Sequence, residues 1–142
     1  MGLKTISIFI LSFVLATIVF ADSPVSKSPA GAKVYIIEPA KGATVASTFK
    51  VKFGLSGMGV APAGVDIENT GHHHLLIDAI ELPDLTKPLP ATEKILHFGK
   101  GQTETEITLE PGIHSLKLIL GNYLHIPHNP PLISDEVIVT VE

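Results

Sequence analysis

The sequence predicts an all-β protein, an immunoglobulin-like β-sandwich of about seven strands preceded by a cleaved signal peptide. Three observations support this prediction. Apolar and polar residues alternate with period two in several stretches. The chain has 11 Pro and 12 Gly among its 142 residues, and they separate these stretches at short intervals. Beyond the N-terminal segment no hydrophobic pattern has the helical period, and the length fits a single domain.

The N-terminal segment has the pattern of a secretory signal peptide. Lys4 precedes an apolar run from Ile6 to Phe20, fifteen residues interrupted only by two Ser and one Thr. The small residues Val19 and Ala21 then occupy the −3 and −1 positions of a cleavage site. A retained membrane anchor is the alternative, but a spanning helix needs about 20 apolar residues. We therefore expect residues 1–21 to be removed and the protein to be periplasmic or secreted.

The folded domain is expected to begin after a short connecting stretch. Residues 22–32 are rich in Ser, Pro, Ala and Gly, which predicts a flexible linker. Residues 33–142 then form one domain, whose first strand is expected at Lys33–Glu38. The clearest strand is Thr48–Leu55, because its odd-numbered residues are apolar and alternate with polar residues or Gly.

The remaining elements follow from the same alternation and from the turn residues. Further strands are expected at His72–Leu82, Ile95–Phe98, Thr103–Leu109, Ile113–Leu120 and Glu136–Val141. Gly- or Pro-rich loops are expected at Ser56–Gly64, Leu82–Ala91 and Gly121–Leu132. The buried core is expected to contain Phe49, Val51, Phe53, Leu116, Leu118, Val137 and Val139.

Composition excludes several classes of function. The ten cationic residues are all Lys and face 14 acidic residues, for a net charge of −4, which argues against nucleic-acid binding. The chain has no Cys, so disulfides, thiolate metal sites and Cys nucleophiles are excluded. It also lacks a Gly-x-Ser-x-Gly motif and a phosphate-binding loop. Copper–zinc superoxide dismutases present His-x-His on a sandwich strand, but they use a disulfide and an Arg that are missing here. The sequence thus predicts a protein that is not an enzyme.

Seven histidines provide the unusual chemistry of this chain. Alternate residues of a strand share a face, so His72 and His74 point together while His73 points to the other face. Two imidazoles in a His-x-His strand can bind one ion, and neutral imidazole suits Zn(II) or Cu(II). The predicted metal ligands are His72, His74, His114, His125, His128 and Met58. Residues expected to surround and support these ligands are Asp78, His73 and His97.

Two other interpretations of the histidines stay open. His114 is expected to point inward with the leucines of its strand, and a buried histidine of this kind can simply bond a nearby carbonyl. His128 precedes Asn-Pro-Pro and can be a turn residue. The histidines would then organise loops without a metal, in an interaction or structural module of the cell envelope, or they would form a site for another ligand.

Five ordered sequence blocks resemble those of the bacterial domain-of-unknown-function family 4399 (DUF4399). The blocks are Gly57–Gly64, Gly71–Asp78, His97–Glu104, Pro111–Leu118 and His125–Pro131. The resemblance covers roughly Val34 to Val141. It implies a short exported bacterial protein made of a signal peptide and one domain. It implies no established activity, and it carries over no catalytic residue.

Together these observations predict an exported, non-catalytic β-sandwich that binds copper or zinc and handles or buffers the metal. The expected partners are the metal ion or another envelope protein. Nucleic acid is not expected as a partner, and no membrane span is expected once the signal peptide is removed.

Overall fold

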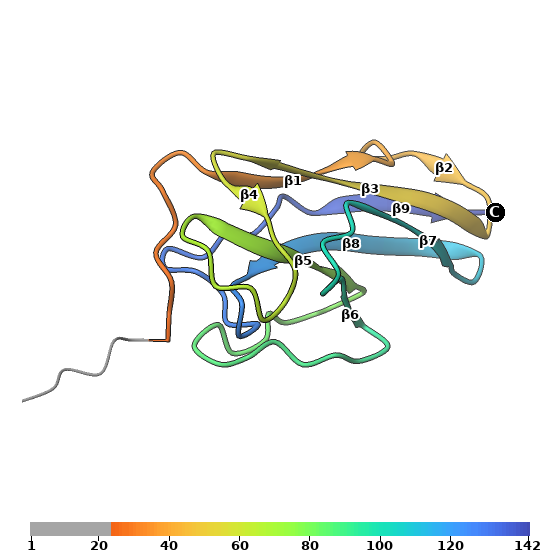
Figure 1. Cartoon of the computed structure of the whole chain (residues 1–142). Coiled ribbons are helices and arrows are strands. Elements are labelled where there is room, and N and C mark those ends of the chain that lie inside the picture. The colour runs from red at the N-terminus through yellow and green to blue at the C-terminus, as the bar shows by residue number, and fades with distance from the viewer. Residues whose placement is uncertain (1–23) are drawn as a thin grey trace, which may run out of the picture.

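The computed structural model describes residues 24–142, and the regular elements in that range are all β-strands, arranged in two sheets (Figure 1). The strands are β1 Lys33–Glu38, β2 Thr44–Val45, β3 Thr48–Ser56, β4 Gly59–Val60, β5 Thr70–Ile77, β6 Ile95–His97, β7 Glu104–Thr108, β8 Gly112–Gly121 and β9 Val137–Val141. The predicted all-β class is confirmed. The expected signal peptide lies outside the described residues. Within residues 24–142 we find no helix of the length and apolarity that crossing a membrane requires.

The two sheets differ in size and pairing. The smaller sheet has the order β1-β3-β7 and is antiparallel throughout. The larger sheet has six strands in the order β2-β9-β8-β5-β4, with β6 also paired to β5. Its central strands are antiparallel, whereas the two-residue strands β2 and β4 join it in parallel. Such short strands leave no alternation in the sequence, which is why β4 falls in a stretch expected to be a loop.

The strand that carries three adjacent histidines ends earlier than expected. The sequence predicts a strand over His72–Leu82, but β5 stops at Ile77. Asp78 follows with a φ of 50°, in the left-handed region, which is incompatible with a continuing strand. The prediction is therefore wrong for residues 78–82, and these residues begin the long irregular connection to β6.

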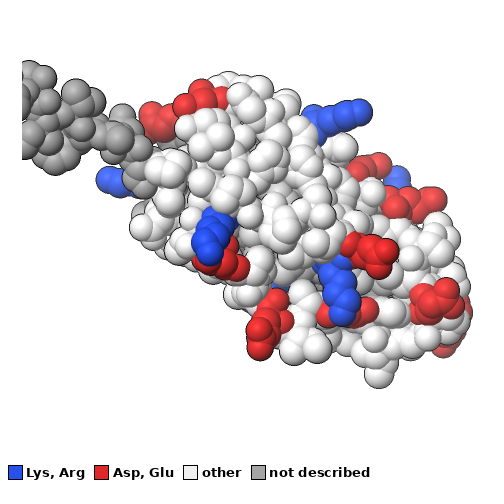
Figure 2. Space-filling model, turned by 90° about the horizontal axis from the view of Figure 1, so that it is seen from below, with Lys and Arg blue, Asp and Glu red and all other residues white. Residues whose placement is uncertain are grey.

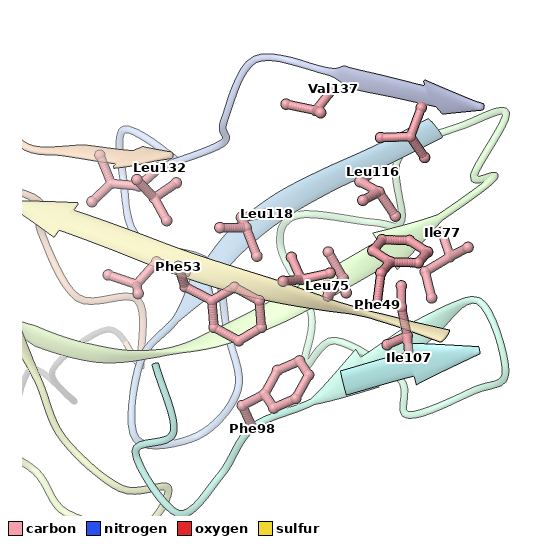
Figure 3. Packing of buried hydrophobic residues seen from close by; sticks show 14 of the residues in the cluster. Phe49, Phe53, Leu75, Ile77, Phe98, Ile107, Leu116, Leu118, Leu132 and Val137 are labelled. Atoms are coloured by element: carbon pink, nitrogen blue, oxygen red, sulfur yellow. The ribbon is translucent and has the colours of Figure 1, made fainter. Parts of the chain in front are cut away.

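The main hydrophobic core lies between the two sheets (Figure 3). Phe53 of β3 contacts the ring of Phe98 at a centroid distance of 4.7 Å, and Leu75 of β5 lies beside them. All seven residues expected in the core are buried: Phe49, Val51, Phe53, Leu116, Leu118, Val137 and Val139. Period two thus predicts correctly which faces of β3, β8 and β9 point inward.

A second, smaller apolar cluster covers the opposite face of the larger sheet. It contains Leu76, Leu89, Ile95 and Ile119, from β5, β6, β8 and the connection before β6. In Figure 1, β6 and this connection lie on the side of β5 away from β1 and β3. Every residue of β5 after Thr70 is consequently buried. This two-sided burial puts the side chains of His72 and His74 under a cover of chain and removes them from bulk water.

The first described residues lie against the loop between β8 and β9. The backbone N–H of Ser28 donates to the Asn129 carbonyl at 3.2 Å, and the N–H of Asn129 donates to the Ser26 carbonyl at 2.9 Å. The Asn122 side chain donates to the Pro24 carbonyl at 2.8 Å. These bonds hold residues whose composition alone predicts flexibility.

The surface carries charges of both signs. On the face shown in Figure 2, Lys and acidic side chains are interspersed among uncharged residues. Exposed pairs such as Lys50–Glu104 and Lys52–Glu38 join neighbouring strands of the smaller sheet. Since both partners of each pair are solvated, such pairs contribute little to stability.

Candidate metal centre

His72 and His74 project from the outer face of β5 into the covered space. Both side chains are 0% exposed, and their ring centroids lie 4.9 Å apart. None of their four ring nitrogens has a hydrogen-bond partner. Buried polar atoms nearly always have a partner, because losing water without a replacement costs free energy. Two neighbouring imidazoles without partners thus have nitrogen atoms that could bind a metal ion.

His97 of β6 completes a group of three. It lies opposite His74 in the antiparallel pairing of β5 with β6. One ring nitrogen from each of His72, His74 and His97 lies within 4.8 Å of the other two. His97 is exposed while the other two are buried, so the group reaches the surface through this residue. The sequence predicts His97 only as a supporting residue, because a three-residue strand gives no indication of its register.

His125 adds a fourth imidazole beside the group. Its ring centroid lies 4.7 Å from that of His97, 5.0 Å from that of His72 and 6.1 Å from that of His74. It projects from the loop after β8, and its φ of 68° is unusual for a residue with a side chain. The structure thus brings the predicted ligand His125 close to His72 and His74, although its nitrogens are not part of the 4.8 Å group.

Two glycines leave room for these rings. A Cβ atom on Gly121 would lie 2.8 Å from Cε1 of His74, and one on Gly99 would overlap the His97 ring. Such distances are too short for real side chains, so residues with a Cβ would displace the imidazoles. Gly99 lies inside the block His97–Glu104 and Gly121 lies between the last two blocks, so glycines near the histidines are a sequence signal for the site that composition and periodicity do not reveal.

Burial favours the neutral form of His72 and His74 at neutral pH. It lowers the pKa of His72 to about 4 and of His74 to about 3, with a further lowering from neighbouring imidazoles. Burial and the nearby His125 ring also lower the pKa of His97. A neutral imidazole offers a nitrogen lone pair, whereas a protonated one cannot bind a metal.

The residues present fit a transition-metal ion. Zinc–imidazole bonds of about 2.0–2.1 Å in a tetrahedron place the ligand nitrogens roughly 3.3 Å apart. The separations of up to 4.8 Å in the group would have to shorten by rotation of the rings. An ion there would give partners to ring nitrogens that otherwise have none.

His114 and Asp78 lie elsewhere, contrary to the expectation that they join or support this group. His114 is five residues along β8 from Ile119, the partner of His74. Five residues of strand span about 17 Å, and the odd spacing puts His114 on the opposite face of β8 from Ile119, so both distance and facing direction separate the two histidines. Nδ1 of His114 instead lies 2.7 Å from a carboxylate oxygen of Asp78, and Nε2 lies 2.8 Å from the Glu110 carbonyl oxygen.

The pKa of His114 shifts upward, in the opposite direction to the pKa values of His72, His74 and His97. Bonds to the Asp78 carboxylate and the Glu110 carbonyl raise the pKa of His114. Partial burial acts to raise the pKa of Asp78, but hydrogen bonds from Ser115 and His114 lower it overall. Since both ring nitrogens face acceptors, these contacts favour the cationic imidazole, the form that can donate from both nitrogens.

Three other residues named by the sequence analysis are engaged outside the group. His128 is buried, with Nε2 3.1 Å from the Thr70 carbonyl oxygen, so it joins the loop to the start of β5. Met58 packs against the main core cluster. His73 points to the opposite face of β5, as predicted, and its ring lies 5.2 Å from that of Phe53. None of the three belongs to the 4.8 Å group.

Comparison with known proteins identifies the family. The family model described as "Domain of unknown function (DUF4399)" matches residues 51–142, well over half of the chain, so the protein belongs to this family. The match contains all five blocks that suggested the resemblance, and it begins within β3. No curated protein and no solved structure matches the chain.

Proposed function

We propose that this DUF4399 protein is a non-catalytic transition-metal-binding protein, whose ligands for copper or zinc are His72, His74 and His97. One observation carries the proposal. The four buried ring nitrogens of His72 and His74 lack partners, and the two rings lie beside a third imidazole, that of His97, at a distance that ring rotation can close. Without a ligand, this arrangement pays for desolvation and gains no hydrogen bond in return.

The donor set favours borderline divalent ions. Imidazole suits Zn(II) and Cu(II), and the group of His72, His74 and His97 contains no carboxylate. Met58 is partly buried and packs against the core cluster between the sheets, while His72 and His74 lie on the other face of β5. A soft thioether ligand for Cu(I) is therefore not supported.

We further propose that the role is handling or buffering of metal outside the cytoplasm. The apolar segment and the small residues before Asp22 support removal of a signal peptide and a periplasmic or secreted location. The two packed sheets support an immunoglobulin-like sandwich as the scaffold. Intact-mass measurement of the protein from its native envelope tests export, and a mass that retains residues 1–21 contradicts it.

Metal titration of the apo-protein tests the binding function. Calorimetry with Zn(II) and visible absorption with Cu(II) should each show binding of about one ion per chain. If neither metal binds more tightly than about 10 μM, the metal function is wrong.

The alternative, an envelope module whose histidines organise loops, is favoured by His114 and His128. His114 bonds to the Asp78 carboxylate and His128 to the Thr70 carbonyl, and each bond joins separate segments of the chain. Their bonds describe these two residues well, but they leave the nitrogens of His72 and His74 without a role. A negative titration would make this alternative the better description of the whole protein.

A further inference from the structure

The loop that carries His125 is built around one buried side chain, Asn122. Its carbonyl oxygen Oδ1 accepts hydrogen bonds from the N–H groups of Leu124 at 2.9 Å and Ile126 at 3.0 Å. Its backbone N–H donates to the Ile126 carbonyl, and its backbone carbonyl accepts from the N–H of His125. Asn122 therefore closes a tight turn whose fourth residue, His125, adopts the left-handed conformation.

The amide nitrogen of the Asn122 side chain is bonded to the segment of residues 24–28, where the described chain begins. Nδ2 donates to the Pro24 carbonyl at 2.8 Å and to Oγ of Ser26 at 3.0 Å. The side chain is 1% exposed, so its four hydrogen bonds are all made with protein. The far end of the loop is held by the same segment, through the bonds between Asn129 and both Ser26 and Ser28.

We infer that the segment of residues 24–28 supports the metal site through Pro24 and Ser26: by way of Asn122 these two residues position the His125 imidazole, which closes onto the ion as a fourth ligand. The inference rests on the proposed metal function and adds a ligand and its support. His125 already lies 4.7 Å from His97 and 5.0 Å from His72 between ring centroids, so a small movement of its turn suffices. A tetrahedral site needs four ligands, and the group on β5 and β6 supplies three.

The coupling acts in both directions. A segment that holds the ligand-bearing loop raises metal affinity, and by thermodynamic linkage the bound metal holds the segment in place. The segment contains a built-in reporter, because trypsin cleaves after Lys27. Lys27 pairs with Asn129 as an isolated bridge, and cleavage requires this contact to open.

The test is limited trypsin digestion with and without Zn(II), read by intact mass. Metal should slow cleavage after Lys27 at least about fivefold in the wild-type protein and have no such effect in His125→Ala. Cleavage after Lys41, in the turn between β1 and β2, is the internal control and should not change. If Zn(II) binds but leaves cleavage after Lys27 unchanged, the inference is wrong.

Affinity measurements give the reciprocal result. Asn122→Ala should weaken Zn(II) binding roughly 10–100-fold, as losses of ligand-supporting contacts do. Ser26→Ala, which removes one bond to Asn122, should weaken it by a smaller factor. Ser28→Ala is the matched control, since its hydroxyl bonds the Pro130 carbonyl and not Asn122.

The outcomes separate the two hypotheses. A wild-type protein that binds neither metal refutes the proposed function. A wild-type protein that binds Zn(II), with unchanged affinity in Ser26→Ala and His125→Ala, refutes only the role of the N-terminal segment and the fourth ligand. If Asn122→Ala fails to fold, the digestion experiment on the wild type and His125→Ala still decides.

Discussion

The two faces of β5 put the same residue type into two different environments. His73 and His74 are adjacent, both are 0% exposed and neither has a hydrogen-bonded ring nitrogen. His73 packs against Phe53 in an apolar core, whereas His74 meets His72, His97 and His125. Desolvation lowers the pKa of His73 to about 4, and at His74 desolvation together with the neighbouring imidazoles lowers the pKa to about 3.

The comparison shows that burial and a lowered pKa do not identify a site by themselves. Both histidines have these properties, and only one has other nitrogen donors within reach. Convergence of donors from β5 and β6 distinguishes the cluster from a histidine that is merely buried.

The largest effect on metal binding is expected from comparing the replacement of His74 by Leu with that of the adjacent His73. His74→Leu should weaken Zn(II) or Cu(II) binding more than about 100-fold, because it removes a ligand from the centre of the group. His73→Leu should leave affinity unchanged, since its ring lies on the other face. Isothermal titration of both variants measures the difference. Equal effects of the two substitutions would show that the face of β5 does not matter and that the site is wrong.

The second prediction concerns the stability of the metal-free protein at acidic pH. His72, His73 and His74 have folded-state pKa values of about 4, 4 and 3, below the ordinary value of 6.5. The unfolded chain therefore takes up protons first, and stability falls as pH drops from about 6.5 toward 4. At pH 5 each group should cost roughly 2 kcal/mol relative to pH 7.

Urea unfolding in the presence of a chelator at pH 7, 6 and 5 measures this loss. His73→Leu should lose less stability than the wild type over the same range, by roughly 2 kcal/mol, because one of the three groups is gone. A wild-type protein with the same unfolding free energy at pH 7 and pH 5 would contradict the buried, neutral state of these rings.

A smaller effect is expected from filling the space beside His74. Gly121→Ala places a Cβ 2.8 Å from Cε1 of His74, so the ring must move and metal affinity should fall about tenfold. Gly59→Ala is the control, since its nearest neighbour, Cγ2 of Thr70, lies at an ordinary 3.4 Å. Titration of both variants with Zn(II) makes the comparison, and unchanged affinity in Gly121→Ala would mean that ring position is not limiting.

The smallest effect on metal binding is expected at His114. His114→Gln should leave affinity within about twofold of wild type, because this residue belongs to the Asp78 pair and not to the cluster. Its raised pKa makes its contribution to stability present at low pH, and that contribution is lost as pH rises through the folded-state pKa. Histidine NMR signals followed against pH would show His114 titrating at a higher pH than the three histidines of β5.

The sequence predicts strands and facing directions better than it predicts distances. Period two places Phe49 and Val51 in the core and puts His72 and His74 on one face, as the structure confirms. The same parity puts His114 on the face of its strand that points to the core, but it does not say that His72 and His74 lie on the outer face of β5, nor how far along the sheet His114 lies. The register between strands decides that, and it depends on packing across the whole sheet.

The inclusion of His97 in the cluster has the same explanation. Its strand, β6, has three residues, and its pairing with β5 is set by the connection that packs Leu89 and Ile95 over the outer face. The sequences of β5 and β6 alone therefore do not show that His97 lies opposite His74. His125 was predicted from a Pro-rich loop, but the Asn122 turn that presents it depends on contacts with residues 24–26.

A metal ion bound under the cover of the outer face of β5 would also cross-link distant parts of the chain. The chain has no cysteine, and an ion held by His72, His97 and His125 would tie together positions separated by 25 and 28 residues. By the reasoning used for a disulfide, closing a loop of this size stabilises the folded chain by about 3 kcal/mol through the lost freedom of the unfolded one. Since unfolded molecules are removed by proteases, the lifetime of each copy would lengthen when metal is plentiful. The amount of this protein in the cell would then follow the metal supply even at a constant rate of synthesis.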